Sequence, residues 1–89
     1  MILMLSNSDY NFFCKYADAP FSGFDVLRAD KLIKLSYKHD NARSAWRPFE
    51  RAYDDAYLEH APGPDYEPDS IGLRLERISD NLVYQSHHQ

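Results

Sequence analysis

Residues 44–61 read SAWRPFERAYDDAYLEHA, and they carry the clearest structural signal in this 89-residue chain. Apolar and aromatic side chains recur there every three or four residues, which predicts an amphipathic helix. With Ser44 as its N-cap, Pro48 lies near the end of the first turn, where a missing N–H matters little. We therefore expect a helix from Ser44 to about Ala61, before the turn at residues 62–64. The apolar face comprises Ala42, Ala45, Trp46, Phe49, Ala52, Tyr53, Ala56, Tyr57 and His60.

The segments before this helix have weaker patterns. Ser8 is a suitable N-cap for a helix that runs to about Ala17, and the Pro- and Gly-containing residues 19–23 end it. A second helix fits from Asp25 onward. The side chains of residues 33–37, however, alternate between apolar and polar, which is typical of a half-buried strand. The sequence leaves helix and strand open for residues 31–38.

The last segment places Ile71, Leu75, Ile78 and Leu82 on one helical face, with Asp69 or Ser70 as its cap. A hairpin is the alternative for residues 71–85, because apolar residues also alternate there and residues 79–81 suit a turn. Four segments of a single domain, residues 1–89, can thus be read as helices, which predicts an all-α fold. The alternative is an α+β fold with a C-terminal hairpin.

The charges are concentrated in one part of the chain. Ten Lys and Arg against fourteen Asp and Glu give a net charge of −4 and a pI of about 5.4, which disfavours direct binding to nucleic acid. Residues 54–70 hold six carboxylates and no Lys or Arg. A block of this kind indicates either a solvated face without a partner or an interaction surface.

The residue types needed for catalysis are sparse. Cys14 is the single cysteine, which excludes an internal disulfide and a zinc site built from several thiolates. The three glycines are far apart and form no phosphate-binding loop. His39, His60, His87 and His88 suit helix ends or a polar tail better than a metal or catalytic site. We expect no catalytic activity, no cofactor and no metal.

The first five residues are apolar, but they are too few for a signal peptide and follow no basic residue. No run approaches the roughly 18 apolar residues that span a bilayer. A cytoplasmic protein without membrane contact is the expectation.

The acidic block predicts a partner-binding surface. Interleaved tyrosines would supply flat contact area, and the carboxylates would imitate the phosphates of a nucleic acid in front of a basic cleft. The candidate residues are Asp54, Asp55, Glu59, Asp65, Glu67, Asp69, Tyr53, Tyr57 and Tyr66.

Residues 66–76, which read YEPDSIGLRLE, resemble the colicin D immunity protein family. In that family a Tyr-Glu-x-Asp segment leads into Gly-Leu at the start of the last helix, and the aromatic, acid-rich stretch from Phe49 to Glu59 is similar too. The resemblance implies a small antiparallel four-helix bundle that plugs the active site of a tRNA-cleaving toxin with acidic side chains. Pro48 and the turn at residues 62–64 depart from the family pattern.

The expected function is therefore that of an immunity protein, a monomer that inhibits the basic nuclease domain of a cognate toxin in a 1:1 complex. The alternative is a phage-encoded acidic inhibitor of a host nucleic-acid-binding defence enzyme, such as a CRISPR or restriction nuclease. Both use the same acidic surface, and neither involves direct binding to nucleic acid or chemistry by this chain.

Overall fold

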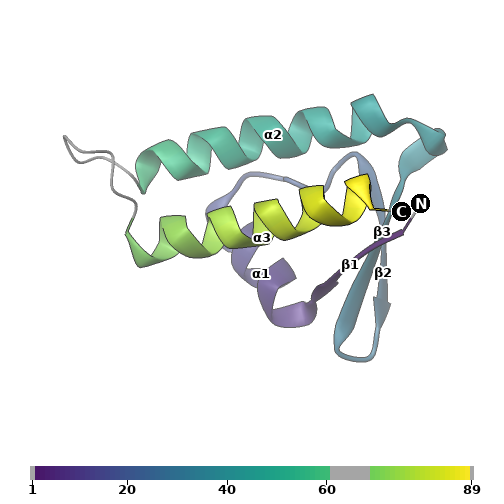
Figure 1. Ribbon diagram of the computed structural model, residues 1–89, viewed down its shortest axis with the longest axis horizontal. Coiled ribbons are helices and arrows are strands. Elements are labelled where there is room, and N and C mark those ends of the chain that lie inside the picture. The colour runs from purple at the N-terminus through teal and green to yellow at the C-terminus, as the bar shows by residue number, and fades with distance from the viewer. Residues whose placement is uncertain (1, 61–68, 89) are drawn as a thin grey trace.

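The computed structural model describes residues 2–60 and 69–88, and within them the fold is α+β (Figure 1). The predicted all-α four-helix bundle is wrong. The alternative prediction, an α+β fold with a C-terminal hairpin, has the right fold class. Residues 70–87, however, form a helix and not a hairpin. In chain order the elements are β1 (Ile2–Ser6), α1 (Asn7–Tyr16), β2 (Phe24–Ala29), β3 (Leu32–Tyr37), a short 3-10 turn (Lys38–Asp40), α2 (Ala42–Glu59) and α3 (Ser70–His87).

The strands form an antiparallel sheet in the order β1-β3-β2. Strands β2 and β3 make a hairpin across Asp30 and Lys31, and Asp30 adopts the left-handed backbone conformation (φ 58°) that such a tight turn requires. Leu35 lies opposite both Leu3 and Val26 and is fully buried. The alternation of residues 33–37 therefore reflects a strand, and the expected helix from Asp25 does not form.

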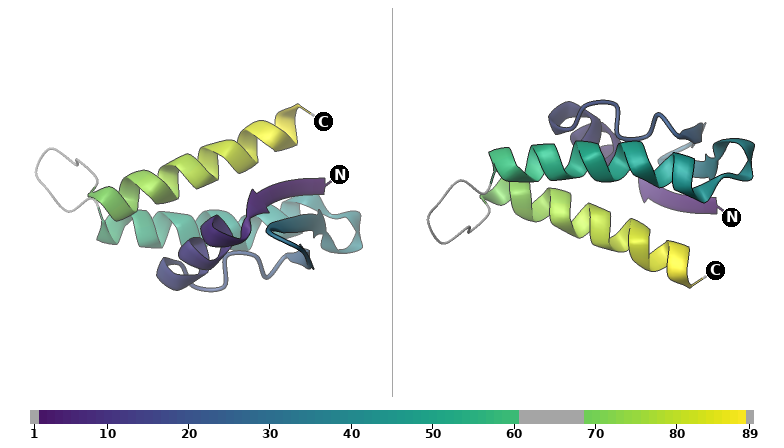
Figure 2. Two further views of the ribbon diagram at one scale, coloured as in Figure 1. Left: turned by 90° about the horizontal axis from the view of Figure 1, so that it is seen from below. Right: turned by 90° about the horizontal axis from the view of Figure 1, so that it is seen from above.

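The helices cover one face of the sheet (Figure 2). Phe13 of α1 stacks on Phe49 of α2 with ring centroids 5.1 Å apart, and both rings are buried. Leu75 of α3 completes this core, whereas Trp46, which the sequence also placed in the core, is partly buried. The opposite face of the sheet carries exposed apolar side chains, namely Ile2, Met4, Leu27 and Leu32.

Helix α2 begins two residues before the predicted N-cap. Asn41 is the cap and accepts a hydrogen bond from the Ser44 N–H, so Pro48 lies further inside the helix than expected. Gly23 packs against the same part of the helix: a Cβ at Gly23 would lie 2.5 Å from the Ala45 Cα and 2.6 Å from the Ser44 carbonyl oxygen. This close approach requires glycine, and it fixes α2 against the segment between α1 and β2.

The C-terminal part of α3 protects one edge of the sheet. The Gln85 side-chain amide donates to the Met4 carbonyl and accepts from the Met4 N–H, both at 2.7 Å. It thereby replaces the hydrogen bonds of a neighbouring strand. Both chain ends lie at the same end of the molecule (Figure 1).

Among the described residues, no helix combines the length and the apolar character needed to cross a membrane.

Candidate partner-binding surface

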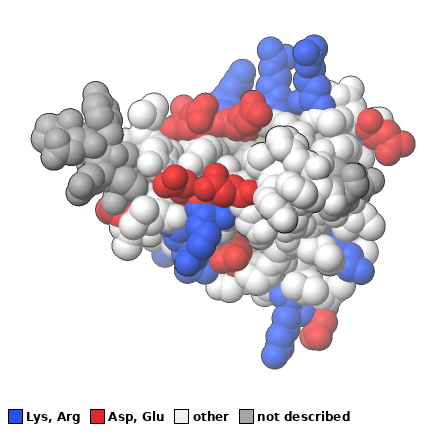
Figure 3. Space-filling view, viewed as in Figure 1, with Lys and Arg blue, Asp and Glu red and all other residues white. Residues whose placement is uncertain are grey.

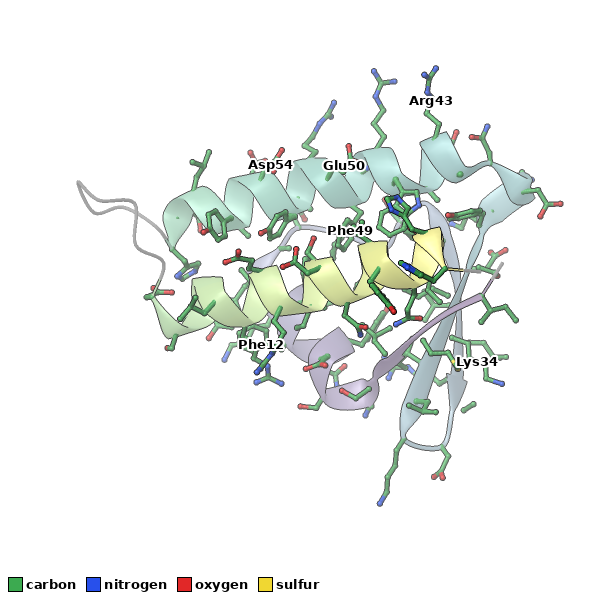
Figure 4. All side chains as sticks on the ribbon, in the orientation of Figure 1. Phe12, Lys34, Arg43, Phe49, Glu50 and Asp54 are labelled. Carbon is green, nitrogen blue, oxygen red and sulfur yellow. The ribbon has the colours of Figure 1, made fainter. Side chains whose placement is uncertain are left out.

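The exposed face of α2 carries most of the predicted acids, but the helix separates them. Successive residues on a helix are rotated by about 100°, so Asp54 and Asp55 lie on two different flanks. Asp54 shares its flank with Glu50, and both side chains point away from the core (Figure 4). Asp55 shares the other flank with Glu59. The three acids that the sequence grouped therefore form two smaller patches.

Helix α3 adds two carboxylates to the Asp54 flank. Burial and the nearby groups Glu76, Tyr57, Asp80 and Asp54 raise the pKa of Tyr53 to about 12, with burial the largest cause. Glu76 and Asp80 belong to α3, which packs against α2, so their charges act on Tyr53 from the neighbouring helix. Figure 3 shows acidic side chains along both helices on this face. We call Asp54, Glu76, Asp80 and Glu50, together with Tyr53 and Tyr57, the acidic seam.

Of the predicted tyrosines that the structure describes, Tyr53 packs against the core, and Tyr57 lies beside it. Tyr53 stacks with Phe49 at a centroid distance of 6.5 Å, and Tyr57 lies 5.6 Å from Tyr53. Both are half-buried. Since the core already fixes their rotamers, these rings can contact a partner at little further cost in side-chain entropy.

On the other flank, Asp55 and Glu59 line a shallow depression between α2 and the end of α1. Ala52 and Ala56 form its floor. Its remaining walls are Tyr16, Ala17, Asp18 and Arg51. Arg51 offsets part of the negative charge here, so this flank is less acidic than the seam.

Asp69 has a role in the fold. It is the N-cap of α3: its carboxylate accepts hydrogen bonds from the Gly72 N–H at 2.8 Å and from His60 Nδ1 at 3.0 Å. Both hydrogen bonds lower the pKa of Asp69, and the bond from the Gly72 N–H has the larger effect. The prediction that Asp69 caps the last helix is confirmed. Its proposed contact with a partner stays a prediction, and Asp65, Tyr66 and Glu67 lie outside the described residues.

The sequence analysis missed a second charged feature on α2. Arg43, Arg47 and Arg51 follow one another at four-residue intervals along its exposed side, and Figure 3 shows basic side chains projecting from this helix. Within the described part of the chain, none of the three guanidinium groups forms an ion pair with a carboxylate. We call these three residues the arginine stripe. Its four-residue spacing is visible in the sequence, but the net charge of the whole chain does not reveal it.

The charges of α2 are placed against its own dipole. Arg43 lies in the first turn, near the positive end, and Glu59 lies in the last turn, near the negative end. Each such placement costs about 0.3–1 kcal/mol relative to the opposite sign of charge. Four of the five charged pairs at four-residue spacing are pairs of like charge, as in Arg43–Arg47 and Asp55–Glu59, whereas Arg51–Asp55 is attractive. The helix dipole and most of these pairs therefore do not favour this pattern.

The residues considered for catalysis are dispersed. His60 pairs with Asp69, and His88 Nδ1 lies 2.9 Å from the Tyr84 carbonyl oxygen. Cys14 is an exposed residue of α1. Partial burial raises the pKa of its thiol, and a hydrogen bond with Tyr10 opposes this effect without cancelling it. Over residues 2–60 and 69–88, no three His, Cys, Asp or Glu side chains are grouped so that they could hold a metal ion.

The four-helix bundle implied by the resemblance to colicin D immunity proteins is overturned by the sheet. The resemblance of residues 66–76 stays a prediction based on sequence. Comparison with known protein families, curated proteins and solved structures finds no match to this chain.

Proposed function

We propose that this protein is a stoichiometric inhibitor that presents the acidic seam to a basic, nucleic-acid-binding cleft of another protein, with a tRNA-cleaving toxin domain as the first candidate. The observation that carries the proposal is the convergence of Asp54, Glu76 and Asp80 from two helices around half-buried tyrosines. Neither folding nor helix stability requires these carboxylates to lie together. A cytoplasmic location follows from this role and is part of the proposal.

The mechanism is electrostatic and steric. Carboxylates on two neighbouring helices form a negatively charged strip, as successive phosphates do along a nucleic acid strand. Such a strip raises the rate of association with a positively charged cleft and disfavours acidic partners. Tyr53 and Tyr57 lie within the strip and offer rigid apolar contact area beside the charges. Occupying the cleft would exclude the RNA without any chemistry by this chain.

The test is a titration against a colicin-D-like tRNase domain, with tRNA cleavage as the readout. The seam variant combines Asp54→Asn, Glu76→Gln and Asp80→Asn. We expect it to bind at least about tenfold more weakly than the parent protein, a loss of about 1.4 kcal/mol. Raising the salt concentration from about 0.1 M to about 1 M should weaken binding by the parent protein more than binding by the seam variant, because salt screens the charges that the variant lacks.

Two control variants make the result specific. Asp25→Asn, Asp30→Asn and Asp40→Asn together remove the same charge from sites outside α2 and α3, and we expect nearly unchanged affinity. Asp55→Asn with Glu59→Gln tests the second flank and should have a smaller effect than the seam variant. Equal weakening by all three variants would mean that net charge matters and the seam does not. If the protein does not bind the tRNase domain, the proposal that its partner is a tRNA-cleaving toxin is wrong.

A further inference from the structure

Helix α2 carries opposite charges on its two halves. The arginine stripe spans residues 43–51, a range that also holds Glu50, whereas Asp54, Asp55 and Glu59 lie in the second half. On the same outer side, Leu58 is 68 % exposed. Among the described residues none of these charges forms an ion pair, so a partner that presents the reverse order of charges would complement this surface.

We propose that two copies of the chain associate through their α2 helices, antiparallel about a two-fold axis, so that the arginine stripe of each lies on the acidic half of the other. The proposal rests on the charge order of α2 and not on the proposed function. A second copy is favoured because the chain itself carries the reverse order of charges that this surface needs. A two-fold interface is also closed, so it gives a dimer and no larger assembly.

The geometry of a helix satisfies both ends of this contact at once. Arg47, the middle of the stripe, and Ala56, which lies between Asp55 and Glu59, are nine residues apart. At 1.5 Å per residue the centres of the two charged halves are separated by about 13 Å. An antiparallel pairing that sets Arg47 opposite Ala56 of the second copy therefore also sets Ala56 opposite the second Arg47. Each stripe then meets a group of carboxylates.

Leu58 gives this contact an apolar component. In the same pairing Leu58 of one copy lies level with the buried Ala45 of the other, so that it faces the exposed side chains of Arg43 and Arg47 on either side of that level. The aliphatic parts of arginine side chains can cover such a leucine while their guanidinium groups reach carboxylates. The contact remains small and mostly charged, so we expect weak, salt-sensitive self-association.

The experiment is sedimentation velocity over a range of protein concentrations. At about 0.1 M salt the Debye length of about 10 Å leaves contact ion pairs effective and screens the repulsion between whole molecules of net charge −4. We expect the mass to rise from 10.4 kDa towards twice that value with concentration. At about 1 M salt, where the Debye length is about 3 Å, the protein should sediment as a monomer.

Charge-swapped variants identify the surface. Arg47→Glu with Arg51→Glu makes the exposed side of α2 acidic, and Asp54→Arg with Asp55→Arg makes it basic. Each variant alone should stay monomeric, and an equimolar mixture of the two should form a heterodimer. As a control, Lys31→Glu with Lys34→Glu makes the same change in charge on the β2–β3 hairpin and should leave self-association intact. Far-UV circular dichroism checks that every variant is folded.

Three results would overturn the proposal. These are a parent protein that stays monomeric at every concentration at the lower salt, swapped variants that self-associate as the parent does, and a mixture that forms no heterodimer. A loss of self-association in the hairpin control would place the contact elsewhere and overturn it too. None of these results requires a nuclease partner, so they can be read apart from the titration against the tRNase domain, although Asp54 belongs to both surfaces.

Discussion

Helices α1 and α2 pack against each other through Phe13 and Phe49, yet they place their charged side chains in opposite ways. In α1, Asp9 lies in the first turn and Lys15 in the last, as the helix dipole favours. Asp9 also pairs with Arg74 at 3.2 Å, and the Lys15 ammonium lies 5.3 Å from the centre of the Tyr16 ring. In α2 the order is reversed, and the three arginines form no ion pair with any described residue.

The difference separates two uses of surface charge. The charges of α1 stabilise the helix and join it to α3, so the fold explains them. The charges at the two ends of α2 oppose its dipole, and most charged pairs at four-residue spacing along it are of like sign, so the fold does not explain this order of charges. Their explanation must lie outside the isolated chain, in what α2 contacts.

The largest expected effect lies in the core that the two helices share. Phe13→Ala and Phe49→Ala each remove a ring that is at most 1 % exposed. Each should lower the free energy of unfolding by about 3–5 kcal/mol, because a large buried side chain is lost and a cavity remains. Urea denaturation measures this loss. Similar losses would show that the helices differ only on their outer faces, whereas a loss below about 1 kcal/mol would contradict the packing described.

A smaller effect is expected from the charges themselves. Asp9→Asn removes a favourable charge at the start of α1 and the partly exposed pair with Arg74, so we expect a loss of about 0.5–1 kcal/mol. Arg47→Gln removes an α2 charge without an ion pair, and it should leave stability unchanged or slightly higher. Thermal unfolding of the two variants side by side provides the comparison. An equal loss in both would remove the distinction between the helices.

The smallest expected effect is a pH dependence of the free energy of unfolding, which arises from Asp69 at the start of α3. Because hydrogen bonds lower the pKa of Asp69 below its ordinary value of 3.8, this carboxylate stabilises the native state above that pH. The contribution is lost as pH falls through the lowered value. Asn also caps helices but does not titrate there, so Asp69→Asn should lose less stability than the parent between about pH 5 and about pH 2.5. Identical acid profiles would contradict a titrating cap.

The long helices could be predicted from sequence because their signals are local. The three-to-four residue spacing around Phe49 and the cap at Asp69 are both found in the structure. The error in fold class arose in the first 40 residues. Strand β1 is almost uniformly apolar and shows no alternation, although Leu3 is buried and Met4 exposed. Its role depends on pairing with β3, about 30 residues further along the chain.

The candidate site was only partly predictable for the same reason. The sequence identifies the acids of α2, and helical periodicity alone separates Asp54 from Asp55. Glu76 and Asp80 reach Tyr53 through the packing of α3 on α2, which no local pattern encodes. The arginine stripe was visible in the sequence. It becomes apparent when the charges are placed on the α2 helix instead of being added into one net charge.

The most direct test of the central claim is the free energy of unfolding of the double variant Arg43→Glu, Glu59→Lys. This variant matches α2 to its dipole without a change in net charge. It also places an acid four residues before Arg47 and a base four residues after Asp55, so that two repulsive spacings become favourable. If the charges of α2 serve a contact outside the chain, the variant should be more stable than the parent by about 0.5–2 kcal/mol. A variant less stable than the parent would show that the fold needs the natural order of charges, and would contradict the account.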